Sequence, residues 1–573
     1  MKFIKENIGL ILILGVAFLS RLPGLFYGYP LALGADETPT VLAALKMIGT
    51  LSWRATATGY YYPALLAYVY LPPIGLFLLL GLVLGFFPDI AAIKETVFLN
   101  FGVFIPLARF LSLLFGLASI WLVYKISQRI FSNKIVSCLA AWFLAINFIQ
   151  AVESSLANTW SAQTFFILFF LWWAIGFFQK NRVVGRDYLW GALVLAGAFG
   201  INVVGILAGW WFVAAQYLKE KRPKIIGGFL RNKYFWLFCL TFILLAGVIY
   251  YLNPAGLNNY AGRVSDAAEP VKDIGAILND QGAGTYKPFT VNTLYIFWFY
   301  VVTLFTTDPV IILLAILGTW YLWRRARNYF YLLAPWPLIY LVMLSPLTRP
   351  NGRYALPVVP ILAILAAVGA NEIWQRLGAK KRLAPALLLL VSVYSLVLSG
   401  ALIMRLQKSD SRVLARNWIL GNIPGGAAIN NIDLGGSLYL VENKKSLELI
   451  KEKAPDLFSS KRNYLLSLAA DKYPEPGYDL IEYPALLPFA PDAQYIILSE
   501  FDYQPLRAKR EQVLSGKLNL VKSFYPVDRP EQAAILPGPR ELQVPYYVPV
   551  FNLVSLFSRY NFYGPYIEIY QLK

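Results

Sequence analysis

The stretch "VFIPLARFLSLLFGLASIWLVYKISQRIF" (103–131) is apolar from 104 to 124 apart from Arg109 and two serines, and Lys125 and Arg129 follow that apolar run. A helix of about 20 such residues is long enough to cross the hydrocarbon core of a bilayer. The stretch therefore predicts a membrane-spanning helix with a basic end.

Comparable apolar runs recur along the chain, whose 573 residues are 58% hydrophobic and 14% charged. Soluble domains carry about 25% charged residues, so the composition predicts a polytopic α-helical membrane protein with about 11–13 transmembrane helices. The expected segments are 8–27, 104–124, 134–151, 161–178, 188–201, 203–218, 234–252, 309–323, 329–346, 354–373 and 384–404.

The net charge of +19 is interpreted from the distribution of the charged residues between the two sides of the membrane. With a cytoplasmic N-terminus, the short inner loops hold 21 Lys/Arg and 3 Asp/Glu, whereas the longer outer loops hold 8 Lys/Arg and 10 Asp/Glu. This is the positive-inside bias of a multi-pass protein of the cell (plasma) membrane. The charge therefore sets orientation, and it does not indicate a nucleic-acid partner.

Composition also excludes some chemistry. The chain has no histidine, which removes histidine acid–base catalysis and histidine-ligated zinc. Cys138 and Cys239 lie inside apolar runs, so no disulfide framework is indicated. No small-residue cleavage site follows residues 1–15, so the N-terminal segment is expected to be a first anchored helix.

The side of the membrane on which a loop lies depends on whether an odd or even number of spans precedes it. This decides how two ambiguous apolar segments are interpreted. If 63–86 spanned the membrane, the basic loop 125–134 would lie outside, and Pro72 and Pro73 interrupt that run. We therefore expect 63–86 to form a re-entrant or interfacial helical pair, and we expect 293–305 to lie at the outer surface. The short segments 188–201 and 203–218 are expected to form a V that meets at Asn202.

Two domains are expected. Residues 1–406 form a transmembrane domain with a long first outer loop (28–103) and a second large outer loop (253–308). Residues 407–573 hold 19 Lys/Arg and 18 Asp/Glu and are expected to form an extracytoplasmic soluble α/β domain. In that tail 409–426 reads as a helix with Ser409 as its cap, and 493–499 and 566–572 read as strands.

Adjacent acids, Asp36 and Glu37, follow the first helix in "YGYPLALGADETPT" (27–40). Neighbouring side chains point in different directions, so one acid can face a substrate while the other anchors the loop or binds a cation. The alternative is that both cap the helix that follows.

Arginines near the outer ends of helices are candidate anion binders. Arg109 lies inside an apolar helix, where a buried guanidinium needs a partner such as a lipid phosphate, unless it snorkels to the headgroups, as Arg21 is expected to do. Arg349 and Arg353 lie in a short outer loop, where Lys and Arg are unusual; headgroup contact is the alternative.

Two further acids lie at expected outer helix ends. Glu153, in "AVESSLANTW" (151–160), is interpreted as a helix cap, although it could also bind a cation or orient an arginine. Asp308, before Pro309, is interpreted as a turn and N-cap residue.

Several motifs together resemble a known family. They are "ADE" (35–37), "YYYPALLAYVY" (60–70), "ARFLSLLFGLASIWLVYKISQRIF" (108–131), "GRYALPVVPILAILAA" (352–367) and "SDSRVLARNWILGNIPGGAAI" (409–429). In this order the chain resembles the GT-C superfamily of membrane glycosyltransferases. Within it, the chain is similar to relatives of protein O-mannosyltransferase and of the aminoarabinose-to-lipid A transferase.

The resemblance implies a GT-C-like bundle and inverting transfer of a sugar. The donor would be a polyprenyl-phosphate sugar, and the acceptor a lipid, glycan or protein on the outer face of the membrane. Asp36 matches the family's catalytic acid, with Glu37 its companion. Arg109 matches the arginine that faces the donor phosphate, and Arg353, with Arg349 near it, falls close to another outer-end arginine.

The chain departs from the family at its metal-binding positions. Some relatives use an active-site histidine, which is absent here, and the later acidic position has Asn158 with Glu153 upstream. A divalent cation (Mg²⁺ or Mn²⁺) would therefore need carboxylates, with Glu37 and Glu153 as candidates. The competing functions are a transporter or flippase of lipid-linked sugars and a non-catalytic scaffold of the cell envelope.

Overall fold

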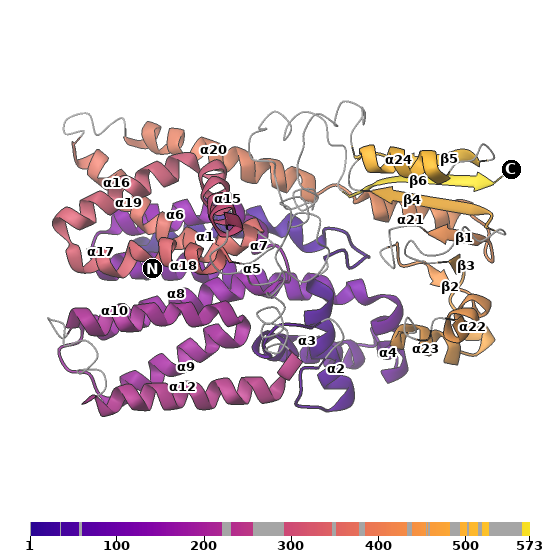
Figure 1. The fold of residues 1–573 in the computed structure, drawn as a ribbon, viewed down its shortest axis with the longest axis horizontal. Coiled ribbons are helices and arrows are strands. Elements are labelled where there is room, and N and C mark those ends of the chain that lie inside the picture. Colours follow the sequence, from indigo (N-terminus) through magenta and orange to yellow (C-terminus); the bar gives the residue numbers. More distant parts are fainter. Residues whose placement is uncertain are drawn as a thin grey trace. The chain divides into compact units, whose positions relative to one another are not determined.

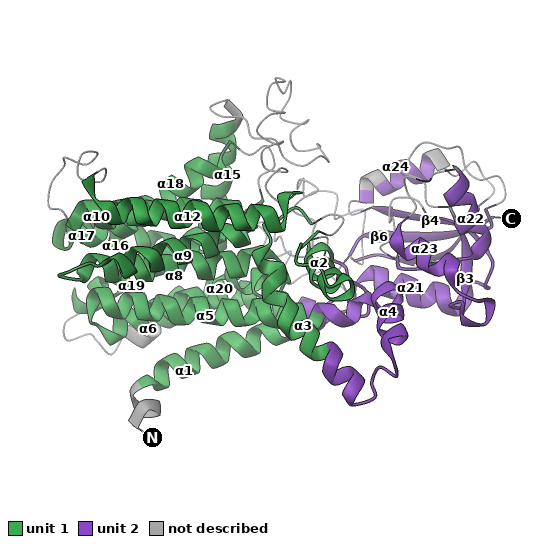
Figure 2. Ribbon diagram, turned by 90° about the horizontal axis from the view of Figure 1, so that it is seen from below, with its two compact units in different colours: residues 1–25, 34–77, 106–403 green, residues 26–33, 78–105, 404–573 purple. Residues whose placement is uncertain are grey.

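The computed structural model has two compact units, each made of segments far apart in the sequence (Figures 1 and 2). Unit 1 comprises 1–25, 34–77 and 106–403, and unit 2 comprises 26–33, 78–105 and 404–573. The structure describes residues 2–34, 36–56, 60–219, 231–255, 291–346, 351–376, 384–431, 438–453, 455, 459–481, 493–500, 503–513, 518–526 and 564–572.

Unit 1 is a bundle of helices. They are α1 (Lys2–Arg21), η1 (Leu22–Phe26), α2 (Glu37–Thr50), α3 (Leu65–Val83), α5 (Ile105–Phe131), α6 (Lys134–Ile146), α7 (Phe148–Glu153), α8 (Thr159–Gln179), α9 (Gly185–Ile201), η3 (Val203–Gly209), α10 (Trp210–Lys219), α12 (Lys233–Leu252), α15 (Val291–Thr307), α16 (Pro309–Arg325), α17 (Arg327–Leu333), α18 (Pro335–Leu344), η5 (Gly352–Val358), α19 (Val359–Arg376) and α20 (Ala384–Leu406). A few of these elements, such as η1, α3 and α20, end in unit 2.

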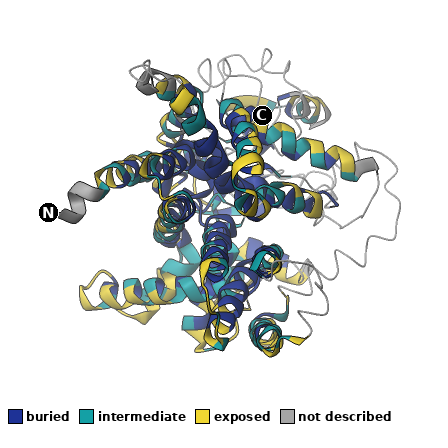
Figure 3. Cartoon of the chain, turned by 90° about the vertical axis from the view of Figure 1, so that its left-hand side faces the viewer, coloured by how far each residue is buried: buried dark blue, intermediate teal, exposed yellow. Residues whose placement is uncertain are grey.

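The outward faces of this bundle are apolar. On α12, Leu240, Ile243 and Leu244 are each more than half exposed, whereas Phe238 faces inward and is buried. Figure 3 shows the same division, with buried residues where helices face one another and exposed residues on the outer faces. Apolar side chains on the outside of an apolar bundle are those of a protein that has lipid as its solvent.

By length and composition, six described helices are able to cross a membrane, or seven if the bent pair α15–α16 counts as one span. They are Asn7–Phe26, Leu65–Val83, Phe101–Phe131, Thr159–Gln179, Lys233–Leu252 and Gly352–Arg376. The predicted polytopic helical architecture is confirmed. The total of about 11–13 spans stays a prediction, since other expected segments form shorter apolar helices such as Lys134–Ile146.

The helical pair expected within 63–86 is wrong. Residues Leu65–Val83 form one helix, α3, with Pro72 and Pro73 inside it. Each proline removes one backbone hydrogen bond. Tyr70 and Ile74, on either side of the prolines, are both fully buried, and their packing holds the helix together across them.

Asparagines interrupt the helices where prolines do not. Asn147 separates α6 from α7, within the expected span 134–151, and its side chain accepts from the Gln150 N–H at 2.9 Å. Asn202 separates α9 from η3 and accepts from the Val204 N–H at 3.2 Å, which confirms the break predicted there. In both cases the side chain satisfies an N–H that a helix start leaves open.

Asp308 lies in the 107° bend between α15 and α16, the pair that includes the segment 293–305. It occupies the N-cap position of α16, as predicted, although its side chain makes no capping hydrogen bond. The carboxylate is buried and accepts hydrogen bonds from the side chains of Asn147 and Ser395. It therefore links the break at Asn147 and the bend between α15 and α16 to α20, which carries Ser395.

Unit 2 contains a six-stranded sheet of order β2-β3-β1-β4-β6-β5, in which β6 runs antiparallel to β4 and β5. Its elements are α4 (Ile90–Leu99), η2 (Phe101–Phe104), α21 (Ser411–Asn422), β1 (Ala428–Asn431), β2 (Val441–Glu442), α22 (Lys444–Lys453), α23 (Ser460–Ser467), η9 (Ala470–Lys472), β3 (Gly477–Ile481), β4 (Tyr495–Glu500), α24 (Tyr503–Val513), β5 (Leu518–Phe524) and β6 (Tyr566–Leu572). The helix and both strands predicted in the tail are confirmed as α21, β4 and β6.

Pieces of segment 28–103, which is predicted to be the first outer loop, pack inside unit 2. The ring of Phe98 stacks on that of Tyr464, with centroids 4.7 Å apart, and the Tyr439 hydroxyl donates to the Ala32 carbonyl at 2.9 Å. The Tyr27 hydroxyl donates to Asp410 at 2.5 Å. Asp410, rather than the predicted Ser409, caps α21 by accepting from the Arg412 N–H.

Asp410 is the centre of a buried polar cluster. Its carboxylate also accepts from the Arg412 guanidinium at 2.8 and 3.0 Å. Burial alone would raise the pKa of Asp410, but Arg412 and the Tyr27 hydroxyl outweigh it, so the pKa is lowered. A lowered carboxyl pKa adds stability above the unfolded pKa of about 4, and this stability is lost as the pH falls below that value.

We expect Asp410→Asn to destabilise unit 2 by about 3–5 kcal/mol at pH 7, because it removes the buried carboxylate that pairs with Arg412 at 2.8 Å. The difference from the parent should shrink as the pH falls below about 4. Circular dichroism melts between pH 7 and pH 3 measure both effects. Glu511→Gln is the control, since its ion pair with Arg507 at 3.1 Å is exposed. Equal losses in the two variants would contradict the prediction.

Candidate active site

The sequence-predicted acids and arginines converge in unit 1. Asp36 and Glu37 begin α2, Arg109 lies in the first turns of α5, Glu153 ends α7, and Arg353 lies in η5. Each is therefore at the end of an element, where the backbone changes direction. Arg349, the remaining predicted arginine, lies outside the described residues.

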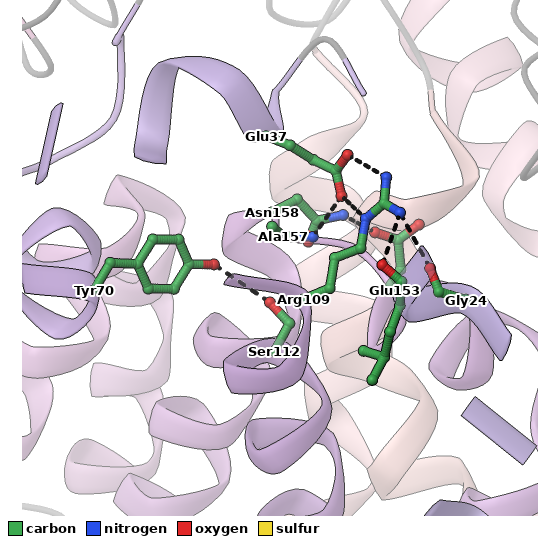
Figure 4. Close-up of polar contacts among 9 residues, drawn as sticks. Gly24, Glu37, Tyr70, Arg109, Ser112, Glu153, Ala157 and Asn158 are labelled. Carbon is green, nitrogen blue, oxygen red and sulfur yellow. Dashed lines mark hydrogen bonds and ion pairs between the residues drawn. The ribbon is translucent and has the colours of Figure 1, made fainter. Parts of the chain in front are cut away.

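Glu37 and Arg109 form a buried, two-pronged ion pair (Figure 4). Both distances, Nε to Oε1 and Nη2 to Oε2, are 2.7 Å, and the two residues are 2% and 1% exposed. The Arg109 Nη1 also donates to the carbonyls of Gly24 and Leu25, and the Ala157 N–H donates to Glu37 Oε1 at 2.8 Å. Planar, bidentate pairing of this kind is among the strongest charge-assisted hydrogen bonding in proteins.

This pair connects four parts of the chain: η1, the start of α2, α5 and the loop before α8. Snorkelling of Arg109 to the headgroups is excluded, because its guanidinium is buried and all three of its nitrogens donate within the fold. A Cβ at position 34 would collide with Glu37 Oε2, so any larger residue there would have to shift the Glu37 carboxylate from its pairing with Arg109.

Asp36 points elsewhere, as expected for the neighbour of Glu37. It occupies the N-cap position of α2 but makes no side-chain capping bond, so the capping alternative fails for Asp36. Its Oδ2 pairs with Arg353 Nη1 at 2.6 Å, and the two side chains are 31% and 22% exposed. The cluster thus has a sealed ion pair and a second pair that reaches solvent.

Glu153 is a buried acid beside these pairs. It ends α7 and does not cap the next helix; that cap is Asn158, which accepts from the Trp160 N–H and donates to Glu153 at 2.5 Å. Burial raises the pKa of Glu153 to about 7, although Arg353 and Asn158 oppose the rise. Glu153 lies just beyond the expected span 134–151.

Arg21 does not snorkel to the headgroups, contrary to the prediction. It is 1% exposed, and its nitrogens donate to Ser154 Oγ at 2.8 Å and to the carbonyls of Ala17 and Ala145, each at 2.9 Å. It therefore holds Ser154, the residue after Glu153.

A metal ion finds no ready site among these acids. In the described part of the chain, no group of three or more His, Cys, Asp or Glu residues is placed to hold one. Of the two candidates, Glu37 has both oxygens engaged by Arg109, and Glu153 has one engaged by Asn158. The carboxylates of Glu37 and Glu153 are therefore better placed to bond the side chains of Arg109 and Asn158 than to hold a divalent metal ion.

We expect Glu37→Gln and Arg109→Met each to lower the stability of unit 1 by about 3–5 kcal/mol, because each leaves one buried charge without its partner. The double variant should recover part of that loss, since it leaves no unpaired charge. Thermal unfolding of the purified protein in detergent measures the three values as a double-mutant cycle. Additive losses in the double variant would show that the pair is not coupled.

Comparisons with known proteins support the fold. No protein-family model and no curated protein matches the sequence. Among solved structures, apo ArnT from Cupriavidus metallidurans is similar over 75% of this chain and 83% of its own, with 14% identity and a TM-score of 0.50.

Two further solved structures cover more of the chain with lower TM-scores. ArnT bound to undecaprenyl phosphate matches 90% of this chain and 96% of its own, with 13% identity and a TM-score of 0.48. The Archaeoglobus fulgidus oligosaccharyltransferase tethered with an acceptor peptide matches 87% and 70%, with 10% identity and a TM-score of 0.46. The chain is a membrane protein with the fold of ArnT, so the resemblance found in the sequence is confirmed at the level of the fold.

Proposed function

We propose that this chain is a glycosyltransferase that moves a sugar from a polyprenyl-phosphate donor to a hydroxyl or amine of an acceptor on the outer face of the membrane. The observation that carries the proposal is the Asp36–Arg353 pair, a partly exposed base and cation joined at 2.6 Å beside a sealed polar cluster. The GT-C fold and the crystal structure of ArnT with undecaprenyl phosphate support the lipid-linked donor.

The reaction is a single displacement with inversion. The acceptor oxygen or nitrogen attacks the anomeric carbon and forms the new bond, while the bond from that carbon to the phosphate oxygen breaks. Asp36 accepts the proton of the acceptor, and polyprenyl phosphate leaves with an added negative charge. Arg353 stabilises that charge, with Arg349 as a second candidate.

The Asp36–Arg353 ion pair links donor binding to base activation. When the donor phosphate binds, it competes with Asp36 for the Arg353 guanidinium. The carboxylate is then released to accept a hydrogen bond from the acceptor. Glu37 and Arg109 stay paired and hold the start of α2, so that Asp36 keeps its place.

In this scheme the Arg353 guanidinium supplies the positive charge that faces the donor phosphate, and no step is assigned to a divalent metal ion. Asp36, Glu37, Arg109 and Arg353 sum to zero charge, and Glu153 adds a negative charge only when it ionises. A Mg²⁺ or Mn²⁺ ion held by Glu37 and Glu153 would have to displace Arg109 and Asn158 from them.

We expect Asp36→Asn to lower turnover of a polyprenyl-phosphate sugar by about 10²–10⁴-fold, the usual contribution of a general base. Asp89→Asn is the matched control. It is the same substitution in the first outer loop, at an exposed position where Asp89 caps α4. Loss of donor sugar and appearance of polyprenyl phosphate are measured with purified protein in detergent.

Near-normal turnover of Asp36→Asn would overturn the role of Asp36. A wild-type protein that moves lipid-linked sugar between leaflets of vesicles without consuming it would instead support the flippase alternative. A non-catalytic scaffold would neither consume lipid-linked sugar nor move it between the leaflets.

We expect the KM for the donor to rise as the pH increases through about 7, with a smaller change in kcat. Glu153 ionises in this range and places an extra negative charge beside the site of the donor phosphate. Glu153→Gln should remove the pH dependence of KM and keep the low value. The measurement is the donor KM of both proteins between pH 5.5 and 8.5; parallel profiles would contradict the assignment.

A further inference from the structure

The first two turns of α8 carry four buried polar side chains that make no hydrogen bond within the fold. The atoms are Thr159 Oγ1, Trp160 Nε1, both amide atoms of Gln163, and Thr164 Oγ1. The four residues are between 0% and 4% exposed. Positions 159 and 163, and 160 and 164, are one helical turn apart, so all four share one side of the helix. We call them the α8 polar face.

Such a concentration of unpaired groups is unusual. Leaving one buried polar group unpaired costs about 1–3 kcal/mol, and native proteins contain only a few such groups per 100 residues. An apolar residue of the same size would avoid that cost at each position. Four of these residues in two turns therefore indicate a hydrogen-bonding partner from outside the chain.

Polar side chains with a structural role behave differently in this fold. Thr319 lies in the interior of a helix, and its hydroxyl donates to the Ala315 carbonyl one turn earlier at 2.7 Å. Ser161, between the residues of the α8 polar face, donates to the Ser112 carbonyl at 2.8 Å and so packs α8 on α5. Thr159 and Thr164 make neither kind of bond.

The α8 polar face begins at the candidate active site. The Trp160 ring lies 4.8 Å from the ring of Tyr354, centroid to centroid, and the guanidinium carbon of Arg353 lies 5.6 Å from the same Tyr354 ring. Asn158, which caps α8, donates to Glu153. The Tyr354 ring therefore links Arg353, where the donor phosphate is proposed to lie, to Trp160 at the start of the α8 polar face.

The backbone near Gln163 is shaped around its amide. A Cβ at Gly205 would lie 2.7 Å from Gln163 Nε2 and would also collide with the Ala198 carbonyl. Only glycine at position 205 lets η3 approach this closely. Gly205 thus lies next to the Gln163 amide, and no protein group bonds to that amide.

The chemistry of the face selects a neutral ligand rich in hydroxyl groups. It offers an indole N–H, an amide with donors and an acceptor, and two hydroxyls, which donate and accept. None of its four residues is charged, so a phosphate has no counter-ion there, and an alkyl chain would leave every polar atom unpaired. Sugar hydroxyls both donate and accept, and they match this set.

We propose that the α8 polar face binds the neutral sugar ring of the lipid-linked donor and that Gln163 determines which sugar is accepted. The inference rests on the proposed function, because it takes the donor phosphate to lie at Arg353. Thr159, Trp160 and Thr164 complete the set of donors and acceptors around the ring.

The test compares Gln163→Met with Gln216→Met. Gln216 is also a buried glutamine, but it accepts from the Tyr188 hydroxyl at 3.3 Å. Without ligand, Gln163→Met should unfold at the same temperature as the wild type or higher, because it removes an unpaired amide. Gln216→Met should unfold at a lower temperature. Thr164→Val, which keeps the shape of the side chain, serves as a second variant of the face.

Binding is measured with undecaprenyl phosphate and with undecaprenyl phosphate carrying mannose, glucose or 4-amino-arabinose. We expect Gln163→Met to weaken binding of the preferred sugar-linked lipid at least about tenfold while binding of bare undecaprenyl phosphate stays within about twofold. Gln216→Met should keep the wild-type preference for the sugar. The inference is overturned if Gln163→Met binds every lipid as tightly as the wild type does. It is also overturned if Gln163→Met weakens binding of the lipids with and without sugar equally. In either case buried water would be the partner of the α8 polar face.

Turnover separates this inference from the proposed function. If the wild type shows a Gln163-dependent preference for sugar-linked lipid but transfers no sugar, the proposed function fails and the subsite stands. If the wild type transfers sugar and Gln163→Met and Thr164→Val keep its sugar preference, the subsite fails and the proposed function stands.

Discussion

The buried ion pair between Glu37 and Arg109 is the constraint on which the candidate site depends. A guanidinium inside an apolar bundle is unfavourable unless a counter-ion and hydrogen bonds surround it, and Glu37 with the carbonyls of Gly24 and Leu25 supplies both. Because these partners come from η1 and α2, the pair ties the loop after the first helix to α5. The same carboxylate accepts from Ala157, which adds the loop before α8.

Two adjacent acids thereby acquire different roles. Glu37 is sealed and its oxygens are engaged, whereas Asp36 stays partly exposed and pairs with Arg353. A third acid, Glu153, is buried with a neutral amide as its hydrogen-bond partner, and burial raises its pKa to about 7. Three carboxyl groups in one cluster are thus distinguished by exposure and partners, and the exposed Asp36 is the one suited to proton transfer.

Helix breaks bring the rest of the polar groups into position. Pro72 and Pro73 leave α3 continuous because packing on both sides outweighs the loss of backbone hydrogen bonds. Asn147 and Asn202 do interrupt helices, because an amide oxygen can cap the helix that follows. The break at Asn202 also starts η3, whose Gly205 lies against Gln163 of the α8 polar face.

The sequence by itself determined the membrane class, most helix positions, the strands β4 and β6, and the divergence of Asp36 from Glu37, because apolar run length, periodicity and side-chain geometry are local properties. It also indicated that Arg109 needs a partner. Only the tertiary structure decided that this partner is Glu37, 72 residues away, that Asp410 joins Tyr27, and that Gln163 is unpaired. The physical reason is that burial and pairing depend on which distant segments meet, and no local pattern records that.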